Sequence, residues 1–306
     1  MIDYFFPAAL MILPIILALA ALQFARQRLK TFMNPLTGSL ARPPASHLAS
    51  KLGTEQLAVG YSLLEIALPV IAPIMLYVQL HEKIIAGEPL WLGFFALVLL
   101  LWLASAVYCV FKLSRRIERI RSLRLAYECE LAVGQELDQL MLDGFHVFHN
   151  LKLASMHIDH VIVGQAGVFA VETWGRTRDR LTSRQDVKQR LRVVYEGGVL
   201  KFPGEDNGGV SERAAKAASA TEKWLSEAIG FEVSVRPVVI LPGWYIENKD
   251  RPEVPVINSG YIQRYFQSQR QLQLNRRDMQ QIANQVDRKI REPVTVASVG
   301  HLAKTA

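Results

Sequence analysis

The hydrophobic positions of the chain are distributed unevenly, and most of the long apolar runs precede residue 112. Three stretches there are each about long enough to cross a bilayer core. The third is long and uncharged, whereas the second contains a glutamate and two prolines, which membrane helices tolerate when neighbours satisfy the freed carbonyls. The pattern predicts a three-helix transmembrane region over residues 1–111, with spans at about 4–24, 57–80 and 90–111.

Two features of these stretches have a second interpretation. The first stretch contains Ala18-Leu19-Ala20, which resembles a signal-peptide cleavage site, but Asp3 precedes it and basic residues follow it, as for an uncleaved anchor. Glu65 is either a functional acid within the membrane or, if the second span begins nearer Leu63, a residue at the interface. We expect an uncleaved anchor and an interfacial Glu65.

Basic residues flank the apolar stretches asymmetrically. The loop 25–56 carries five basic residues against one acid, and six more follow the third span against Glu118 alone. The positive-inside rule then places the N-terminus outside and everything after residue 111 in the cytoplasm. The membrane is then a plasma membrane, the inner membrane in a bacterium. The basic run 112–124 either contacts anionic lipid headgroups or binds nucleic acid, and we expect the headgroups.

The periodicity changes after residue 111, and the remaining chain has the composition of a globular domain. A basic helical linker is expected over residues 112–130, followed by a domain over 131–306. Apolar spacing predicts a helix at 115–142, which Gly134 interrupts, and further helices at 210–229 and 275–290. Strands are predicted at 145–151, 159–163, 168–172, 190–194, 199–202, 235–241 and 254–257. This order indicates an α/β domain with a mixed sheet flanked by helices.

The hairpin predicted around residues 164–167 brings two acids together. If it closes on Gln165-Ala166, paired residue numbers sum to 331, and Asp159 lies opposite Glu172. Opposed side chains have Cβ atoms about 5 Å apart, and two carboxylates at that spacing share a proton or hold a cation. A divalent metal is one interpretation, and an exposed hairpin end with both acids in water is the other.

Charge and cysteine content narrow the function further. The net charge of +7 and a pI near 9.4 suit anionic partners, either nucleic acid or membrane lipid. Cys109 and Cys129 are separated by about 30 Å of predicted helix, which excludes a disulfide between them. The sequence contains no Walker loop, dinucleotide fingerprint or Ser/His/Asp motif.

Several motifs resemble those of the NERD, or nuclease-related, domain, which is similar to the PD-(D/E)xK restriction endonucleases. The resemblance covers about residues 125–245 and is carried by Gly134-Gln135-Glu136, FHVFHNL at 145–151, IDHVIVG at 158–164, GVFAVET at 167–173, KFPG at 201–204 and VVILPGW at 238–244. It implies a restriction-endonuclease-like fold. It also implies a site in which Glu136, Asp159 and Glu172 bind Mg²⁺ or Mn²⁺, which would polarise a scissile phosphate.

The chain departs from the family pattern at the lysine of the metal-binding motif and again at the start of the downstream helix, where it has Asn207-Gly208-Gly209. Trp174 stands where the resemblance implies a lysine, and an indole can neither deprotonate water nor supply positive charge. Arg176, two residues further along, can supply charge but is a poor base, and Lys188 is another candidate substitute. His157 is either a base or outer ligand, or a solvated strand residue, and Trp174 either stacks on a nucleobase or packs. His160 is expected on the opposite face of its strand.

Three functions remain open. The chain is a membrane-anchored protein that binds nucleic acid through a metal–carboxylate site, with phosphodiester hydrolysis weakened by Trp174. Alternatively the domain binds without cleaving, or it is an inactive structural or signalling module that uses the domain for protein contacts. Downstream, Arg213, Lys216 and Lys223 either contact phosphate or form a solvated helix face.

Overall fold

The structure is a computed structural model, and it describes much of the chain after residue 40. The described residues are 41–62, 78, 86, 89–153, 156–175, 192–196, 199–202, 205–207, 209–250, 252–269 and 274–292. Contacts divide the chain into two units. The first comprises Met1–Pro35 and Gly53–Ile120, and the second comprises Leu36–Leu52 and Arg121–Ala306.

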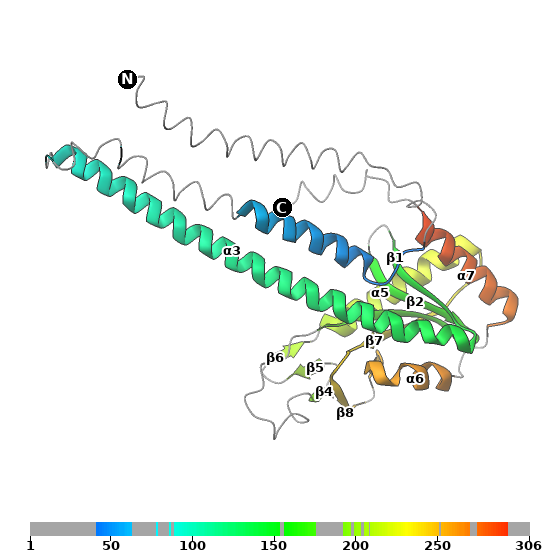
Figure 1. The fold of residues 1–306 in the computed structure, drawn as a ribbon. Coiled ribbons are helices and arrows are strands. Elements are labelled where there is room, and N and C mark those ends of the chain that lie inside the picture. The colour runs from blue at the N-terminus through cyan, green and yellow to red at the C-terminus, as the bar shows by residue number, and fades with distance from the viewer. Residues whose placement is uncertain are drawn as a thin grey trace. The chain divides into compact units, whose positions relative to one another are not determined.

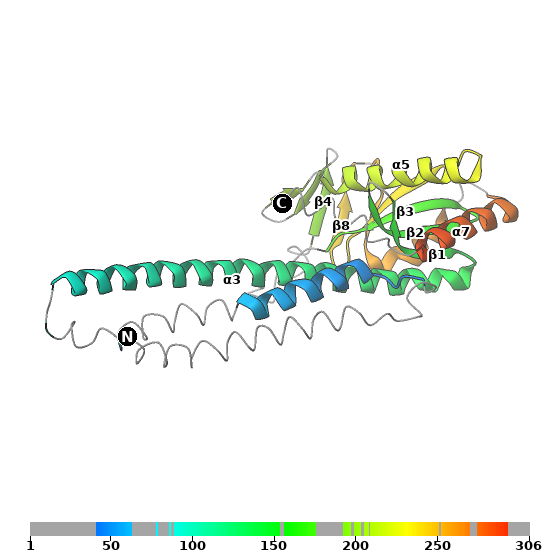
Figure 2. The ribbon, with the colours of Figure 1, turned by 90° about the horizontal axis from the view of Figure 1, so that it is seen from above.

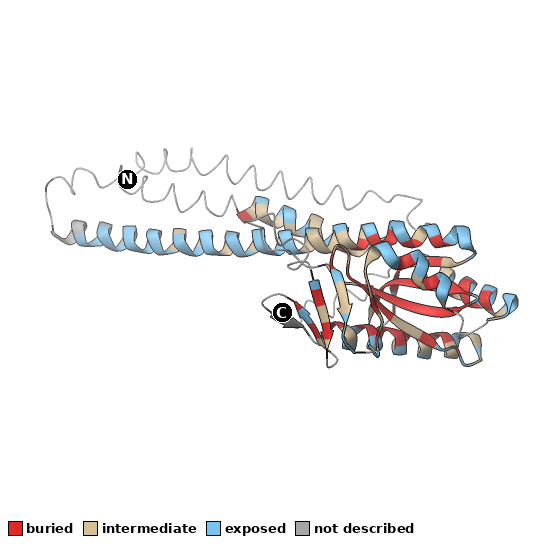
Figure 3. Ribbon diagram, turned by 90° about the horizontal axis from the view of Figure 1, so that it is seen from below, coloured by how far each residue is buried: buried red, intermediate tan, exposed pale blue. Residues whose placement is uncertain are grey.

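The first unit contains most of a long helix, α3 (Pro89–Asp138). Its apolar side chains are exposed along this part, as the pale blue ribbon in Figure 3 shows. In the described residues, one helix (Ala96–Asp143) is long and apolar enough to cross a membrane, and none of its apolar window is buried. This covers much of the predicted third span. The first span and most of the second lie outside the described residues, so a multi-pass topology has no support from the structure.

The second unit is built on a mixed sheet, which confirms the predicted α/β class. Five strands follow the order β1-β2-β3-β7-β9, visible in part in Figure 1. Their bounds are β1 (His146–Lys152), β2 (His157–Gly164), β3 (Gly167–Thr173), β7 (Val235–Ile240) and β9 (Val256–Ile257). The first three strands are antiparallel, and β3-β7 and β7-β9 are parallel. The crossover from β3 to β7 includes helix α5 (Gly209–Ile229).

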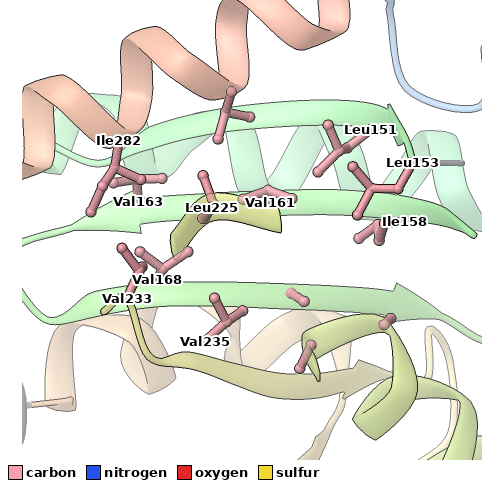
Figure 4. Close-up of a cluster of buried hydrophobic side chains, with 14 of the residues drawn as sticks. Leu151, Leu153, Ile158, Val161, Val163, Val168, Leu225, Val233, Val235 and Ile282 are labelled. Atoms are coloured by element: carbon pink, nitrogen blue, oxygen red, sulfur yellow. The ribbon is translucent and has the colours of Figure 1, made fainter. Parts of the chain in front are cut away.

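Helices cover both faces of this sheet, as Figure 2 shows. One face packs against α5 and α7 (Arg276–Arg291), and Figure 4 shows this core, with Ile282 of α7 beside Val163 and Leu225 of α5 beside Val161. The other face packs against the end of α3, the 3-10 turn η1 (Gln139–Asp143) and helix α6 (Ile262–Ser268). Burial of both faces explains why β2 and β3 are buried at nearly every position.

A smaller sheet follows the order β6-β5-β4-β8. Its strands are β4 (Arg192–Glu196), β5 (Val199–Phe202), β6 (Glu205–Asn207) and β8 (Tyr245–Asn248). The predicted hairpin of β4 and β5 is confirmed. Strands β6 and β8 and helix α6 were not predicted, nor were the 3-10 turn η3 (Ser259–Tyr261) and a helix at 46–62. The strands β6 and β8 are short and exposed or polar, so they have little periodicity to detect.

Gly134 does not interrupt the helix, and this prediction was wrong. Helix α3 continues through Gly134 to Asp138. The glycine instead allows a close approach, because a Cβ there would lie 2.5 Å from Cβ of Pro44. The segment 42–51 therefore packs directly on the end of α3, in the second unit.

Candidate metal centre

The hairpin of β2 and β3 has the register that the sequence predicts. The observed pairs run from Gly164 opposite Gly167 to His160 opposite Val171, so the same register places Asp159 opposite Glu172. Both acids are buried, each 4% exposed. The peptide nitrogen of Thr173 donates to Asp159 Oδ2 at 2.9 Å, which fixes this carboxylate against the end of β3. The exposed-hairpin interpretation is therefore excluded.

A third buried acid comes from α3, and it is Glu130. Its side chain is almost fully buried, and its Oε1 accepts a hydrogen bond from the peptide nitrogen of Ala45 at 3.0 Å. Burial, followed by the negative charges of Asp159 and then Glu172, raises the pKa of Glu130 to about 8. These interactions show that three carboxylates from three elements share one electrostatic environment.

Glu136, the helix acid that the resemblance implied, is not placed with the pair. It is exposed on α3, and in the part of the chain that the structure describes it makes no hydrogen bond or ion pair with Asp159 or Glu172. Glu130 precedes it by six residues and lies on the buried stripe of the helix with Val133, Leu137 and Leu140. An acid at helical spacing within an apolar stripe was the signal in the sequence that identifies Glu130.

Burial raises the pKa values of the two hairpin acids, and the positive charge of Arg213 partly opposes this shift. Burial raises the pKa of Asp159 to about 6. Burial and the charge of Asp159 raise the pKa of Glu172 to about 8, and Arg213 of α5 opposes this shift. Arg213 Nε donates to Glu172 Oε2 at 2.8 Å, with about half of the arginine side chain exposed. The second oxygen, Glu172 Oε1, is buried and has no hydrogen-bond partner among the described residues.

Two histidines lie beside the acids. His47, Glu130 and His157 can each offer one ligand atom, and these atoms all lie within 4.8 Å of one another, so the group can hold a metal ion. His157 Nε2 lies 4.0 Å from Asp159 Oδ1, and it is buried without a hydrogen-bond partner in the described part of the chain. Burial, with the nearby positive charges, lowers the pKa of His157 to about 3, so the imidazole is neutral and retains a lone pair.

The unpartnered buried atoms of the centre test whether its residues fit a metal. Buried polar atoms in folded proteins almost always have a partner, and Glu172 Oε1 and His157 Nε2 are both placed to bind one. Carboxylate oxygens and imidazole nitrogens are both ligands of divalent metals. The residues therefore fit a divalent cation.

The structure describes only some of the other residues that the sequence singled out near the acids. Arg176 and Lys188 lie outside the described residues. Trp174 packs against the core of the smaller sheet, and its peptide nitrogen donates to the carbonyl of Ile240 at 2.9 Å. His160 is buried and bonds to His149 and to Thr173 Oγ1, away from the acids, as expected from strand alternation. Arg213 places a positive charge beside Glu172.

Comparison with known proteins identifies one family. Residues 125–242 match the family described as NERD, the nuclease-related domain. The match contains Glu130, Asp159, Glu172 and Arg213, whereas His47 precedes the first matched residue. No curated protein and no solved structure matches the chain significantly.

Proposed function

We propose that this protein binds nucleic acid through a divalent cation, Mg²⁺ or Mn²⁺, held by Asp159, Glu172 and Glu130, in line with the match of residues 125–242 to the nuclease-related domain. The observation that carries the proposal is Glu172 Oε1, a buried carboxylate oxygen without a partner among the described residues, beside two further buried acids. A bound cation is a partner for these carboxylate oxygens and offsets the repulsion between their negative charges.

Arg213 is the contact for the phosphate. Its guanidinium is half exposed while its Nε is held by Glu172, so its other nitrogens remain available to an anion beside the acids. Arginine recognises phosphate with several donors in a fixed plane. The net charge of +7 favours the approach of any nucleic acid.

Hydrolysis by this centre is expected to be slow. A bound divalent cation supplies Lewis acidity and a water of lowered pKa. The chain's residues position the phosphate with Arg213 and exclude solvent by burying Asp159 and Glu172. Trp174 contributes no base and is partly buried against the core of the smaller sheet, which favours binding over rapid cleavage. His157 lies 4.0 Å from Asp159 but is a weak base, because burial and nearby positive charges lower its pKa to about 3.

The exposed apolar part of α3 is the anchor in this proposal. Large side chains such as Leu97, Leu100 and Val107 are mostly exposed in the structure, and a long exposed apolar surface is normally covered by lipid or protein. The basic run after Phe111 then lies at the cytoplasmic headgroups. The earlier spans and the outside position of the N-terminus remain predictions from the sequence.

Binding and cleavage are tested together on the full-length protein in detergent. Fluorescent single- and double-stranded DNA and RNA are titrated with Mg²⁺, Mn²⁺ or EDTA, and cleavage is followed on gels. We expect Asp159→Asn and Glu172→Gln to abolish the metal-dependent part of binding, and Arg213→Met to weaken binding about tenfold, a loss of about 1.4 kcal/mol. The exposed residues of the same helix, Glu227→Gln and Lys223→Met, are the matched controls.

Cleavage distinguishes the two versions of the proposal. Slow cleavage that is lost in Asp159→Asn identifies an enzyme. Cleavage that appears only in Trp174→Lys identifies a binding module on an intact nuclease scaffold. Binding that is the same in EDTA, or unchanged in both acid variants, contradicts the proposal and favours a module for protein contacts.

A further inference from the structure

We propose that His47, Glu130 and His157 form a site for a transition-metal ion of the Zn²⁺ class, which ties the segment 42–51 to the nuclease-related domain. This site shares Glu130 with the proposed function but requires neither nucleic acid nor hydrolysis. Its three ligand atoms lie within 4.8 Å of one another and come from three separate parts of the second unit.

Asn150 holds His47 in a form that can bind a metal. The Asn150 side-chain nitrogen donates to the carbonyl of Pro43 at 2.5 Å, which turns Oδ1 toward His47 Nδ1 at 2.9 Å. An amide oxygen can only accept, so Nδ1 carries the hydrogen and Nε2 keeps its lone pair. Histidine ligands of metals typically have this arrangement, in which one ring nitrogen donates to an oxygen and the other is free to bind.

The backbone at Asn150 is adapted to this contact. Asn150 lies within β1 with φ of 57°, and the observed β1–β2 pairs omit it and Asp159, which faces it in the register. Asparagine tolerates the left-handed conformation better than most residues. The irregular strand thus presents one amide to both Pro43 and His47.

The other two ligands are also prepared. Glu130 Oε1 is fixed by a hydrogen bond from the peptide nitrogen of Ala45 at 3.0 Å. His157 Nε2 is buried and has no partner among the described residues, with Asp159 Oδ1 4.0 Å away as a fourth donor. The rings of His47 and His157 are in contact, with 3.8 Å between their centroids and a tilt of 47°, so the two imidazoles are neighbours in the fold.

The donor set selects the metal. Two imidazoles with carboxylates suit Zn²⁺ and its neighbours in the transition series, whereas Mg²⁺ prefers oxygen ligands alone. Three protein ligands with a further position for Asp159 or water match the coordination of a zinc site. The centre therefore has an oxygen-rich part at Glu172 and a nitrogen-containing part at His157.

The metal would complete a docked segment that the nuclease-related match does not include. Arg42 donates to the carbonyls of Asn150 at 3.3 Å and Glu292 at 3.0 Å, and Pro44 occupies the space beside Gly134. These contacts bring His47 to the domain without a metal. A bound ion then bridges His47 to Glu130 and His157, which are distant in the sequence. It should therefore slow the detachment of the segment 42–51 from the domain.

The test uses the full-length protein in detergent, freed of metal with a chelator. Zn²⁺ binding is measured by calorimetry in excess Mg²⁺, and Co²⁺ is used as a visible probe of nitrogen ligands. We expect one equivalent of Zn²⁺, with affinity at least tenfold weaker in His47→Gln and His157→Gln and unchanged in the control His146→Gln. Hydrogen exchange of residues 42–51 should slow with Zn²⁺ in the unaltered protein and not in His47→Gln.

Outcomes for the two proposals are separable. Nucleic-acid binding in Mg²⁺ with no Zn²⁺ uptake overturns this inference alone, as does equal Zn²⁺ affinity in His47→Gln. Circular dichroism and the Zn²⁺-induced shift in melting temperature are recorded for each variant. A folded His47→Gln protein with the full shift contradicts the site, and a folded protein without it supports the site.

Discussion

Glu172 shows at the level of one residue how burial prepares the centre for a cation. The pKa values of Glu172 and Glu130 are both raised to about 8, with burial as the first cause, so both acids are largely protonated at neutral pH without metal. Carboxylates bind metals in the deprotonated form, so metal binding must release protons. Metal affinity is therefore expected to rise with pH through this range.

The same shift predicts a pH dependence of stability. Folded Glu172, with its pKa of about 8, keeps its proton up to about pH 8, whereas the unfolded residue releases it near the ordinary pKa of 4.5. The folded state then binds more protons, so the free energy of unfolding falls as pH rises from about 4.5 to about 8. Glu172→Gln should flatten this slope and, in EDTA at pH 8, raise the free energy of unfolding by about 1–2 kcal/mol.

Thermal and denaturant unfolding in EDTA at pH 5 and pH 8 measure this effect. The exposed control Glu227→Gln should retain the full slope. An unchanged slope in Glu172→Gln would show that the residue is ionised in the folded protein, and Glu130 and Asp159 would then carry any remaining dependence.

At the scale of elements, the end of α3 connects the centre to its surroundings. The stripe that buries Val133 and Leu137 against the sheet also directs Glu130 to the acids and leaves Gly134 against Pro44. One helix face therefore contributes to the core, provides the proposed ligand Glu130 and forms the surface on which the segment 42–51 packs. A shift of this segment should therefore displace His47.

Gly134→Ala tests this coupling. The added Cβ would lie 2.5 Å from Pro44 Cβ and 2.9 Å from its Cγ, so the segment must move. We expect a loss of about 1–3 kcal/mol in the free energy of unfolding, as for overpacked sites, together with weaker Zn²⁺ binding.

Gly60→Ala is the matched control. A Cβ at Gly60, which is also helical, meets no atom within 4 Å. This substitution should be neutral or stabilising by up to about 1 kcal/mol. Equal effects of the two substitutions would show that the contact of Gly134 with Pro44 is readily relieved.

The elements show which sequence signals were sufficient. The β2–β3 register was predicted because a glycine-flanked turn between two β-branched runs fixes the pairing locally. Gly134 was misread because its local meaning, a weak helix position, was outweighed by the distant Pro44. The short α6 was missed because seven residues give too few turns for a clear apolar stripe.

At the scale of the whole molecule, the apolar part of α3 and the basic run that follows predict the side of the membrane on which the domain lies. We expect protease to digest the C-terminal domain in inverted membrane vesicles and not in intact spheroplasts, because the basic residues after Phe111 favour the cytoplasmic side. Detergent-treated spheroplasts are the control for protease access. Digestion from outside would reverse the orientation.

The sequence by itself determined the features that depend on neighbours along the chain. These are the long apolar helix, the β2–β3 hairpin, and the register of that hairpin, which places Asp159 opposite Glu172. Only the tertiary structure brought Glu130, Arg213, His47 and His157 to the acids, in place of Glu136. The reason is physical: periodicity encodes which face of an element is buried, whereas the meeting of side chains from distant elements is decided by how those faces pack.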